Sequence, residues 1–190
     1  MKKYDELLNE TFSVCSGKSV LELASFDGHI SKFIRKQKPA SHYTVEPDTE
    51  RAVYGPNTFI GTANDYYNTK VPTVDVVVCM GLLYHLHSPL HLLEQIINKS
   101  KPKVIIIEST HAVEAIIQEE NFNTTGNAYS DKDISTPIAW NLNIENSNYG
   151  TVLSSVGYNT KQFVPHYDDI QLYDWALSKQ NCWMGVYEKN

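Results

Sequence analysis

Residues 19–28 read SVLELASFDG, and this stretch decides the fold. The first five residues combine aliphatic and β-branched side chains, which predicts a short strand. From Gly28 onward, apolar side chains recur at helical spacing until Pro39 ends the pattern. A strand joined to a helix through a tight turn is the opening unit of an α/β sheet, so the sequence predicts this class of fold.

The alternation of strands and helices continues along the chain. Strands are predicted at residues 42–46, 58–60, 74–79 and 103–108, and helices at residues 4–12, 28–39 and 88–97. The runs VDVVV and VIII are apolar on both faces rather than alternating, which is typical of parallel strands that helices cover on both sides. The sequence therefore predicts an open, doubly wound sheet.

Beyond Thr110 the periodic signal weakens. Residues 111–148 are rich in Asn, Thr, Ser and Asp, and the segment is too long for an ordinary loop. We expect it to be a substrate lid or insertion within a single domain that spans residues 1–190. After it, the pattern predicts a helix at residues 149–156, a strand at 161–165 and a last strand at 182–188.

Composition restricts the possible partners. The chain has 190 residues, with 16 Lys and Arg against 22 Asp and Glu, for a net charge of −6. This balance disfavours nucleic acid as a partner and leaves a small-molecule substrate. The three cysteines are widely spaced, and no apolar run approaches the roughly 20 residues that span a bilayer. We expect a cytoplasmic globular protein without a membrane partner.

The turn after the first strand is the expected ligand site, because open α/β sheets bind ligands beyond the carboxyl ends of their strands. A tight turn there brings backbone amides and the positive end of the next helix toward a negative group. Glu46 closes the second strand, and Pro47 keeps it extended. A carboxylate at this place can accept both hydroxyls of a ribose.

Two nucleoside cofactors fit such a turn. A dinucleotide needs the pattern G-x-G-x-x-G, whereas this turn has Gly28 alone, with Ala24 and Phe26 at positions that would need glycine. NAD is therefore disfavoured. S-adenosylmethionine has no phosphate, needs less glycine, and can use an acid such as Glu22 near its cationic end.

The ordered segments VLELASFDG, TVEPD, GTANDYY, VDVVVCMGLLYHLHSP and VIIIES resemble the class I S-adenosylmethionine-dependent methyltransferases. The resemblance covers residues 17–109, and residues 149–188 resemble the family's last helix and terminal strands. It implies a Rossmann-like, mostly parallel seven-stranded sheet with an antiparallel terminal strand. It also implies S-adenosyl-L-methionine as the cofactor.

The resemblance further implies where the cofactor is held. The methionine part would lie against the turn, the ribose on Glu46, the adenine on Pro47, and the amino group on the main chain near Met80. The implied cofactor residues are Glu22, Ala24, Ser25, Phe26, Gly28, Glu46, Pro47, Ala63, Asn64 and Met80. Two positions depart from the family: Ala24 replaces a glycine, and Thr62 follows the third strand where an acid is usual. Asn64 or Asp65 could take the place of that acid.

Methyl transfer is an in-line displacement, so the enzyme mainly positions the acceptor and excludes water. An acceptor hydroxyl or protonated amine needs a base, and histidine suits neutral pH. His85, just past the fourth strand, is the candidate base, although it could instead pack under the cofactor. Tyr84 could orient an acceptor, and Glu108 could accept a hydrogen bond from one.

No metal is expected. His85, His87 and His91 resemble a metal cluster, but the first two are two residues apart in a turn and have no acidic partner close in sequence. Aromatic residues such as Tyr129 and Trp140 could line an acceptor pocket, or could equally fill the core.

Three functions remain open. The first is methyl transfer to an O or N atom of a small polar metabolite or natural-product intermediate. The second is RNA modification, tRNA in particular, which requires the helix carrying Lys32, Arg35 and Lys36 to contact RNA rather than to present a solvated face. The third is a degenerate, non-catalytic S-adenosylmethionine-binding partner protein, suggested by Ala24 and Thr62.

Overall fold

The computed structural model describes residues 4–50, 52, 55–83, 86, 88–110, 148–164 and 182–190. Its elements are, in chain order, α1 (Tyr4–Thr11), a 3-10 helix η1 (Phe12–Cys15), β1 (Ser19–Leu23), α2 (His29–Lys36), β2 (Ser41–Glu46), β3 (Thr58–Ile60), α3 (Ala63–Tyr67), β4 (Val76–Met80), α4 (Pro89–Gln95), a π-helical turn η3 (Ile96–Ser100), β5 (Val104–Thr110), α6 (Asn148–Ser155), β6 (Tyr158–Val164) and β7 (Cys182–Lys189).

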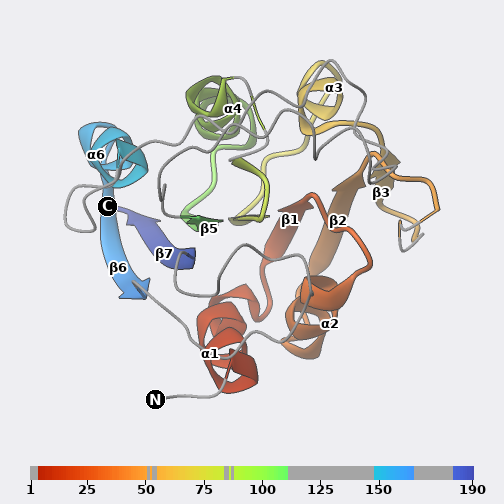
Figure 1. The fold of residues 1–190 in the computed structure, drawn as a ribbon, viewed down its shortest axis with the longest axis horizontal. Helices are drawn as coiled ribbons and strands as arrows, with labels where there is room; N and C mark the ends of the chain where they lie inside the picture. Colours follow the sequence, from red (N-terminus) through yellow and green to blue (C-terminus); the bar gives the residue numbers. More distant parts are fainter. Residues whose placement is uncertain are drawn as a thin grey trace, which may run out of the picture.

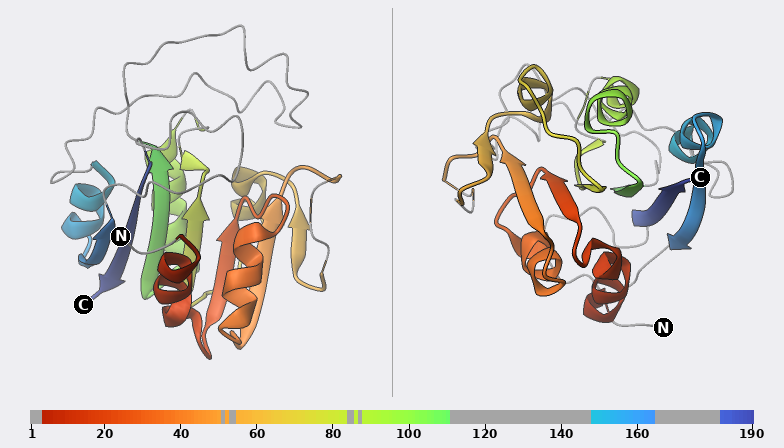
Figure 2. Two further views of the ribbon diagram at one scale, coloured as in Figure 1. Left: turned by 60° about the horizontal axis from the view of Figure 1, so that its bottom comes forward. Right: turned by 180° about the vertical axis from the view of Figure 1, so that it is seen from behind.

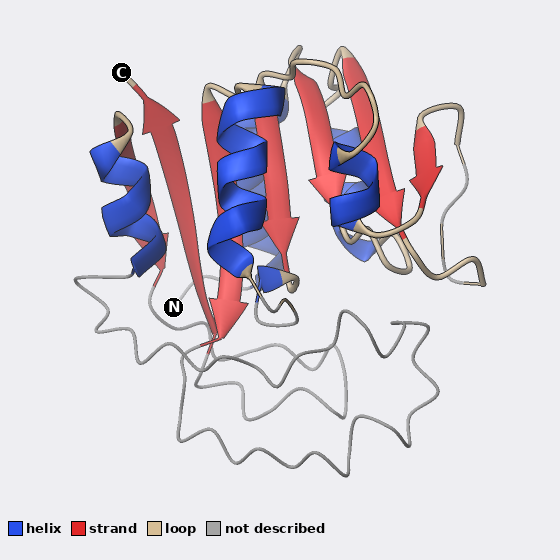
Figure 3. Ribbon diagram, turned by 90° about the horizontal axis from the view of Figure 1, so that it is seen from above, coloured by secondary structure: helices blue, strands red, loops and turns tan. Residues whose placement is uncertain are grey.

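The strands form one seven-stranded sheet in the order β3-β2-β1-β4-β5-β7-β6. The pairs among β1 to β5 are parallel, whereas β7 runs antiparallel to both β5 and β6. Figure 3 shows the arrow of β7 opposed to that of β5. The chain builds outward from β1 through β2 and β3 and then returns to β4, so the switch point lies between β1 and β4. The predicted doubly wound, mostly parallel sheet is confirmed.

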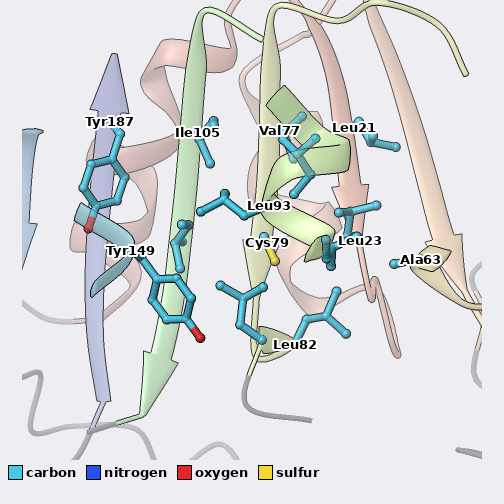
Figure 4. Close-up of a cluster of buried hydrophobic side chains, with 14 of the residues drawn as sticks. Leu21, Leu23, Ala63, Val77, Cys79, Leu82, Leu93, Ile105, Tyr149 and Tyr187 are labelled. Atoms are coloured by element: carbon cyan, nitrogen blue, oxygen red, sulfur yellow. The ribbon is translucent and has the colours of Figure 1, made fainter. Parts of the chain in front are cut away.

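Helices cover both faces of the sheet. Figure 1 and the second panel of Figure 2 show α1 and α2 on one face and α3, α4 and α6 on the other. Consecutive residues of β1 divide between two hydrophobic clusters: Val20 packs toward α1 and α2, while Leu21 and Leu23 pack toward the opposite helices. Figure 4 shows the cluster on the face that α3, α4 and α6 cover, in which Leu93 of α4 packs over Val77 and Cys79 of the sheet. The consecutive apolar runs in the sequence fill these two layers.

The predicted elements agree with the structure in type, with small shifts at their ends. The strands at 19–23 and 58–60 have the predicted bounds, and the helix expected to reach residue 97 continues through η3 to Ser100. One helix, α3, was not predicted. Most of the expected lid lies outside the described residues, and its final residue, Asn148, opens α6. No helix among the described residues is long and apolar enough to cross a membrane.

Candidate active site

The turn between β1 and α2 has an unusual backbone. Ala24, Phe26 and Gly28 have φ values of 59°, 48° and 76°, so every second residue is in the left-handed region. Glycine adopts this region freely, whereas other L-residues do so at a cost of roughly 1–2 kcal/mol. The turn therefore has the backbone path of a glycine-rich loop, with two of its three glycine positions occupied by other residues.

Glu46 ties this turn to the end of β2. Its Oε2 accepts a hydrogen bond of 2.6 Å from the amide of Phe26, and its Oε1 accepts one of 3.0 Å from the amide of Asp48. The side chain is fully buried. A second link runs from the Ser25 amide to the Val45 carbonyl, at 3.1 Å. Because charged hydrogen bonds are the stronger kind, this carboxylate fixes the turn in place.

Glu22 lies beneath the turn, in β1, and its partners come from two other elements. Its Oε2 accepts a hydrogen bond of 2.6 Å from the Ser31 hydroxyl of α2, and it lies 2.8 Å from Nε2 of His42 in β2. Glu22 and Ser31 are buried, and the side chain of His42 is only 8% exposed. Glu22 is one of the predicted cofactor residues, but its two partners were not predicted, since nothing in the spacing of Ser31 and His42 reveals them.

Nε2 of His29 and Nδ1 of His42 are among the buried polar atoms near the turn that have no hydrogen-bond partner within the described chain, and two further such atoms lie at the turn itself. They are the hydroxyl of Ser25, which is 4% exposed, and the second oxygen, Oε1, of Glu22. Gly28, the N-cap residue of α2, has no side chain, and the His29 amide at the start of that helix donates to the Asp27 carboxylate at 2.9 Å. Unsatisfied buried polar atoms are uncommon and often mark the position of a water or a ligand. Oε1 of Glu22 can accept a hydrogen bond from an ammonium group, and the Ser25 hydroxyl and the N-terminus of α2 can receive a carboxylate. Together they fit the ammonium and carboxylate of an amino acid group.

The residues expected at the adenine lie beside the end of β2. Pro47 is half-buried next to Glu46, and the amide of Gly61 donates to the Glu46 carbonyl at 3.1 Å. In the first turn of α3, Ala63 is buried in the core and Asn64 is exposed.

Thr62 and Asp65 form a capping box at the start of α3. Oδ2 of Asp65 accepts from the amide and the hydroxyl of Thr62, at 3.1 and 2.7 Å, while the Asp65 amide donates to the Thr62 hydroxyl. Oδ2 of Asp65 is thus engaged in starting a helix. The T-x-x-D spacing before Tyr66 is the sequence signal for α3, a helix that was not predicted.

Met80 and Glu108 end the neighbouring strands β4 and β5. They pair in the sheet register, and the Gly81 amide donates to the Glu108 carbonyl at 3.3 Å. Leu23 of β1 pairs with Cys79, so Met80 lies at the same edge of the sheet as the turn. Glu108 is half-buried. The register brings the predicted cofactor residues and Glu108 to one edge.

Several predicted residues lie outside the described part of the chain. They are the candidate base His85, Tyr84, His87, Tyr129 and Trp140. Their roles stay predictions. Among the residues that are described, no group of three or more His, Cys, Asp or Glu could hold a metal ion.

A sequence family described as "Methyltransferase domain" matches residues 2–149, more than three quarters of the chain. The chain belongs to this methyltransferase family. The predicted class of enzyme is thereby confirmed. No curated protein matches the sequence.

Solved methyltransferase structures share the architecture. The small RNA methyltransferase HEN1 has a TM-score of 0.63 at 10% identity, covering 98% of this chain and 25% of its own. The N-terminal domain of EvdMO1, in the presence of SAH and D-fucose, has a TM-score of 0.60 at 16% identity. The match covers 100% of this chain and 83% of that one. A SAM-dependent methyltransferase from Aquifex aeolicus has a TM-score of 0.60 at 15% identity. The match covers 99% of this chain and 90% of that one. At these identities the likeness establishes the class I fold of this methyltransferase.

Proposed function

We propose that this methyltransferase transfers a methyl group from S-adenosylmethionine to an O or N atom of a small polar metabolite or natural-product intermediate. The observation that carries the proposal is the left-handed turn held to the buried carboxylate of Glu46 by the 2.6 Å bond from Phe26. When bound, the cofactor supplies a methyl carbon that its sulfonium makes electrophilic.

The described residues support a place for each part of the cofactor around the turn. Ser25 and Glu22 each offer a buried polar atom to the methionine end, and the start of α2 is favourable for its carboxylate. Glu46, whose two oxygens accept from the amides of Phe26 and Asp48 at the end of β2, is the carboxylate proposed to receive the ribose hydroxyls. Pro47 and Asn64 flank the adenine.

The acceptor side rests on fewer described residues. Glu108 lies at the end of β5 at the same edge as Met80, where its carboxylate can receive a hydrogen bond from the acceptor. His85 as the base and Tyr84 as an orienting group complete the proposal. Their part is to hold the nucleophile near the methyl carbon and to take its proton.

A small acceptor is favoured by the distribution of charge. The basic residues Arg35 and Lys36 end α2, seven residues or about 11 Å along the helix from its start at the turn. Lys38 lies beyond them, beside the amino end of β1, because its carbonyl accepts from the Gly17 amide at 3.2 Å. Residues 111–147 contain six acidic residues and one lysine. Arg35, Lys36 and Lys38 thus lie at the edge of the sheet opposite the turn, whereas Lys32 lies nearer to it, so one basic side chain of α2 is placed to meet a polyanion at the turn.

RNA is the second candidate acceptor. The structural likeness to the small RNA methyltransferase HEN1 supports this candidate. The likeness to the EvdMO1 domain, whose structure was solved in the presence of D-fucose, supports a small acceptor instead. Incubating the protein with methyl-labelled cofactor and a cell extract, then separating RNA from small molecules, distinguishes the two. We expect the label in the small-molecule fraction, and label found only in RNA would contradict the proposed acceptor.

The cofactor half is tested by calorimetry with S-adenosylhomocysteine. Glu46→Gln removes the charge that holds the turn and the ribose, so we expect the affinity to fall at least tenfold, about 1.4 kcal/mol. Glu50→Gln is the matched control, because Glu50 is an exposed acid four residues further along. Equal affinities for the two variants, or no binding by the native protein, would contradict the proposal.

A further inference from the structure

We propose that Tyr149 binds the methyl acceptor by donating a hydrogen bond from its phenol to an oxygen atom of the acceptor molecule. The inference rests on the proposed function and adds to its acceptor side a residue that was not predicted. It starts from the position of Tyr149 in the first turn of α6, the helix that follows residues 111–147.

The start of α6 lies at the same edge of the sheet as the turn after β1. Tyr158, the first residue of β6, pairs with Lys189, and the neighbouring Glu188 pairs with Val104 at the beginning of β5. β6 therefore begins at the amino end of β5, and α6, which leads into β6, runs toward that end from the carboxyl edge. A helix of eight residues is about 12 Å long, so Tyr149 lies near the carboxyl end of β5.

The aromatic neighbour of Tyr149 places it at this edge independently. The centroid of its ring lies 6.1 Å from that of Trp183, which is fully buried. Trp183 pairs in the sheet with Ser109, one residue before the end of β5. Trp183 is in turn stacked on Phe163, at 5.7 Å between the ring centroids. The phenol ring is thus held in place before an acceptor arrives, which reduces the entropy cost of binding one.

The hydroxyl of Tyr149 is directed toward the chain that leaves β4. Tyr149 belongs to the same hydrophobic cluster as Cys79, in the last turn of the β4 run, and Leu82, just beyond it. Figure 4 shows the phenol oxygen pointing along the face of the sheet toward Leu82 and the carboxyl edge. The chain continues from Leu82 to His85, the proposed base. The hydroxyl therefore lies beside the segment on which the proposed acceptor side depends.

The hydroxyl of Tyr149 is available to a ligand. Buried tyrosine hydroxyls usually find a partner, and two in the same cluster do. The Tyr67 hydroxyl lies 2.9 Å from that of Ser100, and the Tyr158 hydroxyl donates to the Pro102 carbonyl at 2.6 Å. Tyr149 is only 3% exposed, yet its hydroxyl has no hydrogen bond to another described residue. A polar atom of a bound molecule would supply the missing partner.

The surroundings of Tyr149 make it a donor rather than a base. Burial, followed by the neighbouring Cys79, raises the pKa of its phenol well above the ordinary value. The phenol therefore keeps its proton throughout the physiological range and donates to an oxygen, leaving the removal of the acceptor's proton to another group. Tyr149 would thus favour acceptors that carry a carbonyl, ether or hydroxyl oxygen over those whose only polar group is a cationic amine.

The test compares Tyr149→Phe with the native protein, using methyl-labelled cofactor and serial dilutions of the small-molecule fraction of a cell extract. We expect the variant to need about three- to tenfold more of this fraction for half-maximal labelling, as the loss of one hydrogen bond allows. At saturating amounts of the fraction it should reach the native rate, and its affinity for S-adenosylhomocysteine should stay within about twofold of the native value.

Tyr158→Phe is the matched control. It also removes one buried tyrosine hydroxyl from the cluster, but that hydroxyl bonds to Pro102 at the amino end of β5. This variant should need the native amount of the fraction, because its hydroxyl lies at the edge of the sheet opposite the acceptor.

A measurement on the native protein replaces the variant if Tyr149→Phe does not fold. With carbon-13 at Cζ of the tyrosines, the NMR signal of Tyr149 should move when the fraction is added in the presence of S-adenosylhomocysteine, and that of Tyr158 should not. An unchanged Tyr149 signal, equal half-maximal amounts for Tyr149→Phe and native protein, or an equal loss of affinity for S-adenosylhomocysteine would overturn the inference. Absence of labelled small molecules with the native protein would instead contradict the proposed function.

Discussion

At the scale of single residues, Ala24 and Phe26 show how the turn departs from its family. Both occupy the left-handed region, at φ values of 59° and 48°, which glycine adopts freely and other residues do not. A methyl or benzyl side chain narrows the conformations of the unfolded chain and strains the folded one. The turn keeps its shape because Glu46 and the Val45 carbonyl hold its amides.

We predict that Ala24→Gly raises the free energy of unfolding by about 0.5–1 kcal/mol, because relief of the left-handed conformation exceeds the entropy cost of glycine. Ala40→Gly is the matched control. Ala40 is exposed and does not have a positive φ, so glycine there should lower the free energy of unfolding by a similar amount. Urea denaturation measures both variants, and changes of the same sign would show that the left-handed turn stores no strain.

At the scale of elements, Asp75 joins the first strand to the fourth. Its Oδ2 accepts from the amide and the hydroxyl of Ser19, at 3.1 and 2.8 Å, and these bonds lower the pKa of Asp75. A carboxyl group with a lowered pKa stabilises the fold above its unfolded pKa of about 3.9, and the contribution disappears as the pH falls through the folded value.

We predict that Asp75→Asn lowers the free energy of unfolding by about 1 kcal/mol at pH 7. The difference from the native protein should shrink once the pH falls below about 4. Lys103→Met removes the 3.5 Å ion pair with Asp75, but Lys103 is 72% exposed, so the loss should stay below about 0.5 kcal/mol. Thermal unfolding at several pH values tests both changes. A pH-independent loss in Asp75→Asn would mean that the carboxylate charge is unimportant.

The elements also show what the sequence reveals and what it does not. Strands were predictable because helices cover both faces, so their apolar runs are unbroken. Helix α3 was missed because it has only five residues, too few to show a helical period, although its capping box was readable. In the candidate site, the turn and Glu46 could be predicted because they lie at the carboxyl ends of β1 and β2. The contacts of Glu22 with Ser31 and His42 join three separate elements, so they depended on packing that no local pattern encodes.

At the scale of the whole molecule, the basic end of α2 and the turn lie at opposite edges of the sheet. We predict that reversing the charge at both Arg35 and Lys36, to Glu, changes the affinity for S-adenosylhomocysteine less than twofold. The two charges lie about 9 to 11 Å from the start of α2 along the helix axis, beyond a Debye length of about 8 Å at physiological salt. Lys32→Glu is the charge reversal with which the double variant is compared, because Lys32 lies nearer the turn on the same helix. Loss of methyl transfer to RNA in the double variant would instead indicate that this end of the molecule contacts the acceptor.

The position of β7 has a consequence for synthesis on the ribosome. This strand lies between β5 and β6, and β6 pairs in the described sheet with β7 alone. A nascent chain that has exposed residues 158–164 therefore cannot dock them until residues 182–189 emerge. Until then the β5 edge is open to intermolecular pairing. Chains stalled before Cys182 should for that reason be substrates for chaperones, whereas those that have added Trp183 and its neighbours can close the sheet.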